Sequence, residues 1–216
     1  MFLNRQDAAI QLAAQLTKYR GQDGIVLAIP RGGVPLGYII AQRLGFPLEV
    51  ALSKKIGHPS NPEYAIGSVT LDSAVVNENA AGVPMRYIEE ETARLQAKLR
   101  ENFRLFMGGH TPTNLKGKTV IVVDDGIATG HTMVSMVQAI RKSQPGKLVV
   151  AVPVAPPHAA HQLRPLVDEY VCLSQPEGFM AVGQFYVDFE QVSDEEVIAL
   201  LHQNAASATN RGGIVL

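Results

Sequence analysis

Short apolar runs, each followed by a turn and then a helical pattern, constrain the fold of this chain most. Residues 25–29, 119–123 and 148–152 are such runs, and almost unbroken apolar character is typical of a strand buried on both faces. Strands that alternate with helices pair in parallel through right-handed crossovers. The sequence therefore predicts an α/β fold with a doubly wound, mainly parallel sheet.

The other patterns predict further helices, strands and loops around this sheet. We expect strands over residues 48–52 and 170–173, a β-hairpin over 65–76, a polar loop over 53–62, and helices over 34–44, 84–106, 130–142 and 157–166. Asn4, three residues before Asp7, predicts the start of an N-terminal helix, and residues 193–196 predict the start of a last one. The charged 84–106 helix could form a hood, contribute to a dimer contact or simply face solvent, and the sequence does not decide among these three roles.

The length and composition fit a single domain. With 216 residues, of which 46% are hydrophobic, the chain has enough apolar side chains for a substantial core. We expect one domain over residues 1–203, with a helical insertion at about 77–115 and small hood elements at about 174–192. Residues 204–216 are expected to form a loose tail.

Charge, cysteine content and hydropathy exclude several classes of protein. The net charge of -1 argues against a dedicated nucleic-acid binder, and a single cysteine excludes a disulfide framework. No stretch reaches the roughly 20 apolar residues of a membrane span. The first residues also lack the apolar run of a signal peptide, which predicts a cytoplasmic protein without membrane partners.

The most informative motif is a predicted strand followed by two acids and a turn of small residues. The turn and the helix start after it would let backbone N–H groups converge on an anion, with hydroxyl donors nearby. Two adjacent carboxylates would repel a phosphate, unless the ligand also presents vicinal hydroxyls or a metal ion. A sugar phosphate meets both requirements. The candidate binding residues are Asp124, Asp125, Gly126, Ile127, Ala128, Thr129, Gly130, His131 and Thr132.

This motif resembles the phosphoribosyl pyrophosphate (PRPP) signature of the type I phosphoribosyltransferase family. The resemblance covers a hydrophobic strand, Asp-Asp, a variable pair, Ala-Thr-Gly, one residue and Thr. It implies that Asp124 and Asp125 hold the ribose hydroxyls and that residues 128–132 hold the 5′-phosphate. It also implies the family's fold over nearly the whole chain. Without the resemblance, the motif could be a strand-to-helix turn with capping acids.

A second segment follows the first apolar run and is similar to the pyrophosphate loop of the same family. It comprises Pro30, Arg31, Gly32 and Gly33, in which the glycines allow close backbone approach to an anion and Arg31 adds charge. In the family this loop often carries a cis peptide bond that does not precede proline. The resemblance places such a bond at Pro30-Arg31.

Two further segments have functional and structural interpretations. Lys54 and Lys55 precede residues 56–66, where family members carry a mobile loop, so that Lys55 would meet pyrophosphate and Glu63 would anchor the loop. Residues 179–189 resemble the family's base-recognition stretch. The candidates there are Phe179, Phe185 and Tyr186 for the base and Asp188 for a metal, although the spacing is one residue longer than in 6-oxopurine enzymes. The alternatives are a solvated lysine pair and core aromatic residues in an edge strand.

The resemblance predicts Mg²⁺-dependent transfer of ribose 5-phosphate from PRPP to a nitrogenous base, with release of pyrophosphate. The candidate catalytic residues are Lys55, Arg31, Asp124 and Asp125, and Mg²⁺ would be bound through PRPP. Ala128 stands where 6-oxopurine enzymes have an aspartate, which argues against a standard hypoxanthine or guanine enzyme. We expect small-molecule substrates and a homodimer. The alternative is a non-catalytic regulator that senses PRPP or nucleotides.

Overall fold

The central sheet consists of five parallel strands in the order β2-β1-β6-β7-β8. In this computed structural model, the backbone of residues 1–212 and the side chains of residues 1–207 are described. All residues of β1 and β6 are buried, because helices cover both faces of these strands. The strands are β1 (Gly24–Ala28), β2 (Leu48–Val50), β6 (Thr119–Val123), β7 (Lys147–Val154) and β8 (Glu169–Ser174).

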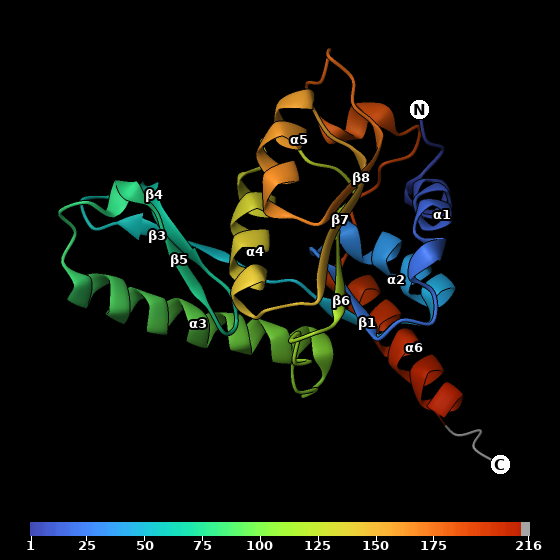
Figure 1. Ribbon diagram of the computed structural model, residues 1–216, viewed down its shortest axis with the longest axis horizontal. Coiled ribbons are helices and arrows are strands. Elements are labelled where there is room, and N and C mark those ends of the chain that lie inside the picture. Colours follow the sequence, from blue (N-terminus) through green and yellow to red (C-terminus); the bar gives the residue numbers. More distant parts are fainter. Residues whose placement is uncertain (213–216) are drawn as a thin grey trace.

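Helices form a layer on each face of the sheet (Figure 1). One layer contains α1 (Arg5–Gln15), α2 (Gly33–Leu44) and α6 (Asp194–Gly212), and the other contains α4 (His131–Lys142) and α5 (Pro157–Leu163). Alternate residues of β1 belong to two hydrophobic clusters on opposite faces of the sheet. Val26 faces the first helix layer and Leu27 faces the second. The predicted doubly wound α/β fold is confirmed.

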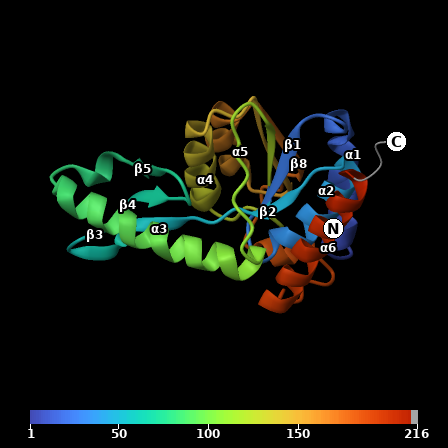
Figure 2. The ribbon, with the colours of Figure 1, turned by 90° about the horizontal axis from the view of Figure 1, so that it is seen from below.

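A second unit, which we call the lobe, projects from the β2 edge of the sheet (Figures 1 and 2). It contains the antiparallel strands β3 (Lys54–His58), β4 (Asn61–Val69) and β5 (Ala74–Val76), which pack with α3 (Met85–Met107). The predicted hairpin over 65–76 is present. The prediction of a polar loop over 53–62 is wrong, because these residues include β3 and the start of β4. The lobe therefore begins before the expected insertion at 77–115. Apolar side chains bury one face of α3, namely Ile88, Leu95, Leu99, Phe103 and Phe106.

The C-terminal helix continues past the predicted end of the domain. Helix α6 runs to Gly212, so the expected loose tail is wrong for residues 204–212, and residues 213–216 lie outside the described residues. Asn204 is only 3% exposed, and its Oδ1 accepts a hydrogen bond of 2.9 Å from the backbone N–H of Leu48. This helix therefore supports the edge strand β2.

The segment before α6 lies against the N-terminus. Residues 179–190, which we call the hood segment, contain the short 3₁₀ helix η4 (Val182–Phe185) and not the predicted edge strand. Phe2 donates its backbone N–H to the carbonyl of Phe185 at 2.8 Å and accepts from Val187 N–H at 2.9 Å. The N-terminal residues thus fix the hood segment beside α1. The remaining short 3₁₀ helices are η1 (Thr17–Tyr19), η2 (Glu78–Ala80) and η3 (Arg164–Leu166).

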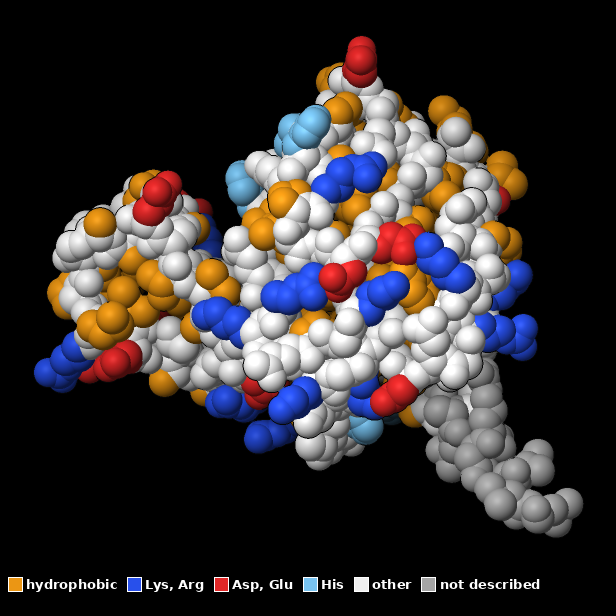
Figure 3. Space-filling view, in the orientation of Figure 1, with side chains coloured by type: hydrophobic (Ala, Val, Ile, Leu, Met, Phe, Trp, Pro, Cys, Tyr) orange, Lys and Arg blue, Asp and Glu red, His pale blue; other side chains and the backbone are white. Residues whose placement is uncertain are grey.

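The face of the molecule drawn in Figure 3 carries charged side chains of both signs. Lys and Arg side chains are interspersed with Asp and Glu on this face. Across residues 1–212, no helix is both long and apolar enough to cross a membrane.

Candidate functional site

The two loops identified from the sequence meet at the carboxyl edge of the sheet. Strands β1 and β6 are neighbours, with Ala28 opposite Val123, and Ile29 N–H donates to the carbonyl of Val123 at 2.9 Å. The strand order reverses between β1 and β6, where open α/β sheets bind their ligands. The glycine loop (residues 30–33) and the carboxylate loop (residues 124–132) leave the sheet side by side here, as predicted.

The glycines of the glycine loop touch the carboxylate loop directly. A Cβ atom on Gly32 would lie 1.9 Å from Oδ2 of Asp125, and one on Gly33 would lie 2.7 Å from the carbonyl oxygen of Val123. Only glycine lets the two loops approach this closely. The expected cis peptide bond at Pro30-Arg31 is present. Arg31 is exposed, and its Nη1 lies 3.8 Å from Oδ1 of Asp194 at the start of α6.

Asp124 and Asp125 are held in a largely buried pair. Oδ1 of Asp124 accepts a hydrogen bond of 2.8 Å from the backbone N–H of Asp125. Burial and the neighbouring Asp125 carboxylate raise the pKa of Asp124 well above its ordinary value. Burial also raises the pKa of Asp125, although the Arg5 guanidinium acts in the opposite direction. The pair therefore favours holding a proton when no ligand or cation neutralises it.

Arg5 contacts this pair, although no sequence motif identified it as a site residue. Its Nε donates to Oδ2 of Asp125 at 2.9 Å, and the two side chains are 13% and 14% exposed. A single arginine in the first turn of a helix carries no local sign of such a role. Its partner is 120 residues away in the sequence.

Asp124→Asn is expected to stabilise the protein at neutral and alkaline pH by about 1 to 2 kcal/mol, because asparagine removes a buried charge and keeps the Oδ1 acceptor. The pKa of Asp124 is raised in the folded state, so wild-type stability falls as pH rises from the ordinary carboxyl pKa through the folded one. The gain from the substitution should therefore be largest above that range and vanish below it. Urea unfolding from pH 4 to pH 9 measures this. A gain that does not depend on pH would contradict the argument.

The carboxylate loop ends in an anion cradle at the start of α4. Gly130 adopts a φ of 84° and provides no side-chain cap, so the first N–H groups of α4 have no partner from the helix itself. Ala128, Thr129, His131 and Thr132 are exposed around this end. Free N–H groups and the positive end of the helix dipole suit a phosphate.

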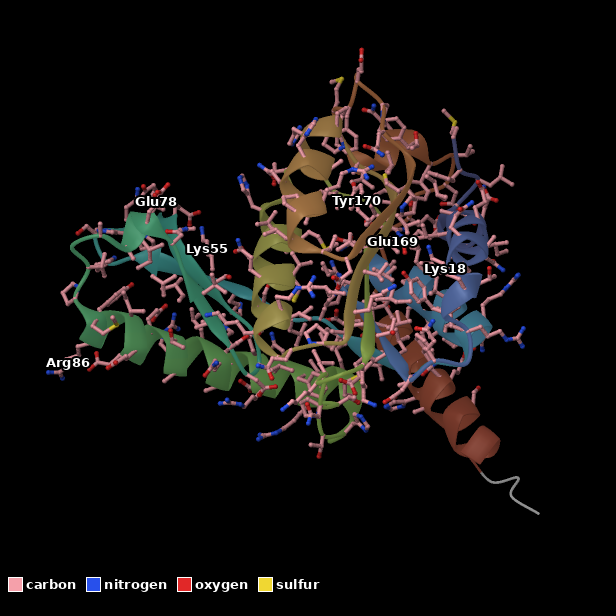
Figure 4. The ribbon with its side chains drawn as sticks, viewed as in Figure 1. Lys18, Lys55, Glu78, Arg86, Glu169 and Tyr170 are labelled. Atoms are coloured by element: carbon pink, nitrogen blue, oxygen red, sulfur yellow. The ribbon has the colours of Figure 1, made fainter. Side chains whose placement is uncertain are left out.

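Lys55 lies on the lobe, not on the central sheet (Figure 4). Its Nζ is 2.7 Å from Oε2 of Glu63 across the β3–β4 hairpin, in an exposed ion pair. Glu63 thus pairs with Lys55 across a β-hairpin whose register shifts at Gly57, and not within an irregular loop. A role of Lys55 toward pyrophosphate stays a prediction.

The aromatic candidates of the hood segment have different surroundings. Phe179 and Phe185 are half-buried and stack with ring centroids 5.4 Å apart. Tyr186 is 6% exposed, and its hydroxyl donates a hydrogen bond of 2.6 Å to the carbonyl oxygen of Asp125. Its ring also packs on Phe2 and Phe189. We therefore interpret Tyr186 as a support for the carboxylate loop and leave it out of the base site.

The carboxylates present fit a Mg²⁺ ion that arrives with a phosphate ligand. Within the described part of the chain, no three His, Cys, Asp or Glu side chains gather as a metal cage. Mg²⁺ typically keeps several waters and uses one or two carboxylates together with substrate phosphates. Asp124 and Asp125 meet this need beside the cradle. Asp188 is exposed, and its Oδ1 accepts from Glu190 N–H at 3.3 Å.

Comparison with known proteins assigns the family. The model of the phosphoribosyl transferase domain matches residues 3–190, which include both loops and the hood segment. The chain belongs to the phosphoribosyl transferase domain family. The resemblance stated from the two sequence motifs is therefore confirmed.

Two relatives of this phosphoribosyl transferase domain match nearly its whole length. A Mycobacterium tuberculosis protein, which carries a provisional phosphoribosyl transferase name, is 36% identical over 96% of this chain and 48% of its own length. The chain thus spans about half the length of the curated relatives it matches. The crystal structure of TT1426 from Thermus thermophilus is 38% identical, with a TM-score of 0.83 over 94% of this chain and 98% of that one.

Proposed function

We propose that this phosphoribosyl transferase domain catalyses Mg²⁺-dependent transfer of ribose 5-phosphate from PRPP to a nitrogenous base. The observation that carries the proposal is the meeting of the glycine loop, the carboxylate pair and the open start of α4 at one edge of the sheet. These three features match the three parts of PRPP, which are the pyrophosphate, the ribose hydroxyls and the 5′-phosphate.

Each group has a defined part in the proposed reaction. Asp124 and Asp125 accept hydrogen bonds from the ribose hydroxyls, and residues 128–132 hold the 5′-phosphate. The glycine loop holds the pyrophosphate with its backbone, and Arg31 adds positive charge. Lys55 would reach the same pyrophosphate when the β3–β4 hairpin closes over the site. Closure would exclude water, which otherwise competes with the base for the ribose.

Catalysis of the proposed bond changes depends mainly on the positioning of the reactants and on electrostatic stabilisation. The bond between ribose C1 and the pyrophosphate oxygen breaks, and a bond from C1 to a base nitrogen forms through a cation-like ribose. The leaving group takes the electron pair of the broken bond, and the proton that the base nitrogen loses passes to solvent. Fixed carboxylates near the ribose and donors near the pyrophosphate stabilise this separation of charge. Mg²⁺, when bound with PRPP, supplies further neutralisation of the phosphate charge.

The half-buried pair Phe179 and Phe185 is the proposed base platform. An aromatic face offers stacking to any planar base. Ala128 in the carboxylate loop provides no acid toward the base, which disfavours hypoxanthine and guanine as acceptors.

We also propose a cytoplasmic homodimer that uses only small-molecule substrates. The lobe exposes apolar side chains that a second copy could cover, visible on its face in Figure 3. Tyr64, Val76 and Met85 are 48%, 45% and 66% exposed. Sedimentation of the purified chain tests this, and a monomer at high concentration would contradict it.

Pyrophosphate release from Mg²⁺–PRPP tests the reaction across a panel of purine and pyrimidine bases. We expect one base to increase release at least about tenfold over the no-base control. PRPP binding without release for any base would favour the alternative of a non-catalytic regulator that senses PRPP. Absence of both binding and release would contradict the proposed function.

A further inference from the structure

Arg5 joins the carboxylate loop to the N-terminal helix. Its Nε donates to Oδ2 of Asp125 at 2.9 Å, and its Nη2 lies 2.9 Å from the same oxygen. A cationic side chain that is 13% exposed and directed at one oxygen of a buried acid is a specific arrangement, unlike an ordinary surface ion pair. Arg5 therefore occupies Oδ2 from the protein side, and the lack of a side chain on Gly32 leaves the room that this oxygen needs.

The hood segment holds Arg5 in place from the other side. Nη1 of Arg5 donates to the carbonyl oxygen of Glu190 at 2.6 Å, and the guanidinium lies 3.9 Å from the ring centroid of Phe189. Phe189 stacks on Tyr186 at 4.9 Å, and the Tyr186 hydroxyl donates to the carbonyl of Asp125. Arg5, Asp125, Tyr186 and Phe189 thus form a closed ring of contacts among three chain segments.

Other charged groups near Asp125 do not duplicate Arg5. The groups that face Asp125 are Arg5 from α1, Asp124 from its own loop and Tyr186 from the hood segment. Asp124 adds negative charge, and burial raises the pKa of Tyr186, which keeps its hydroxyl neutral. Arg31 of the adjacent glycine loop lies near Asp194 instead.

We propose that Arg5 is a positioning residue for PRPP: it fixes Oδ2 of Asp125 so that Oδ1 is presented to a ribose hydroxyl. The inference rests on the proposed function and deepens it by adding a residue outside both sequence motifs. It also gives a reason for the backbone hydrogen bonds between Phe2 and the hood segment, because Phe189 and Glu190 of that segment hold the guanidinium against the acid.

A positioning role for Arg5 has a consequence for ligand selectivity that a purely structural role would not have. In the proposed function, Asp125 binds the ribose and the glycine loop binds the pyrophosphate. Loss of Arg5 should therefore weaken the binding of ligands that present ribose hydroxyls. It should leave the binding of pyrophosphate alone nearly unchanged.

The test compares Arg5→Gln and Arg5→Lys with the control Arg43→Gln, an exposed arginine on α2. Calorimetry measures the binding of Mg²⁺–PRPP, ribose 5-phosphate and Mg²⁺–pyrophosphate to each variant, and the Tm of each variant is recorded. We expect Arg5→Gln to weaken the binding of Mg²⁺–PRPP and ribose 5-phosphate about tenfold or more and to leave pyrophosphate binding within about twofold of the wild type. Arg5→Lys keeps a charged donor near Oδ2 and should recover part of the lost affinity. Arg43→Gln should match the wild type.

Two results would overturn the role of Arg5 alone. One is wild-type affinity of Arg5→Gln for Mg²⁺–PRPP. The other is an equal loss of affinity for all three ligands together with a lowered Tm, which describes a structural arginine. Absence of PRPP binding by the wild-type chain would overturn the proposed function and this inference with it. If Arg5→Gln does not fold, a loss in Arg5→Lys confined to Mg²⁺–PRPP and ribose 5-phosphate supports the proposal, and an equal loss for all three ligands or no loss overturns it.

Discussion

Replacing both acids of the carboxylate loop, Asp124→Asn with Asp125→Asn, is expected to weaken Mg²⁺–PRPP binding by about 100-fold or more. Each carboxylate would contribute a charged hydrogen bond to a ribose hydroxyl, worth about 1.5 to 3 kcal/mol, and both are lost. Calorimetry of the variant and the wild type at pH 8 measures the change.

The double variant has an internal control for folding. Asp124→Asn should raise stability, whereas Asp125→Asn removes the charged partner of Arg5 and should lower it, so the two changes oppose each other. A single cooperative unfolding transition well above the temperature of the calorimetry would show that lost binding is not unfolding. Glu101→Gln, an exposed change on α3, is the matched control and should bind normally. Wild-type affinity in the double variant would remove the ribose role of both acids.

Gly33→Ala is expected to cost about 2 to 3 kcal/mol of unfolding free energy and to impair PRPP binding. The new Cβ would lie 2.7 Å from the carbonyl oxygen of Val123 and 3.0 Å from Cα of Asp124. Both are backbone atoms at the end of a fully buried strand, so they cannot move aside as a flexible side chain could. Urea unfolding with one fixed m value measures the loss.

Gly178→Ala provides the comparison for that substitution. A Cβ at Gly178 meets no atom within 4 Å, so alanine there should change stability by less than about 0.5 kcal/mol. Equal midpoints for the two variants would show that the glycine loop and the carboxylate loop are not in such close contact.

The sequence was most informative where burial leaves little freedom. Residues 119–123 could only form a strand covered on both faces, and the register of β6 with β1 then brings the glycine loop beside the carboxylate loop. The cis peptide bond at Pro30-Arg31 followed from family resemblance and not from local propensity. The central sheet and the two motif loops could therefore be predicted from the sequence.

Features that depend on tertiary contacts could not be predicted from the sequence. Strand β3 is polar at Lys54, Lys55 and His58, and it forms because Ile56 is fully buried within the lobe. The start of the C-terminal helix was predicted, but its part from residue 204 onward was predicted as a tail because the anchor, Asn204, bonds to Leu48 across 156 residues. Arg5 was missed for the same reason, since the helix-start pattern around Asn4 contains no sign of Asp125.

Titration of the wild-type chain with Mg²⁺–PRPP in a calorimeter tests the central claim most directly. We predict one saturable site per chain and competition by ribose 5-phosphate, which shares the ribose hydroxyls and the 5′-phosphate. Inorganic phosphate at equal concentration should compete far less. Absence of saturable binding at millimolar PRPP would contradict the assignment of the glycine and carboxylate loops as a PRPP site.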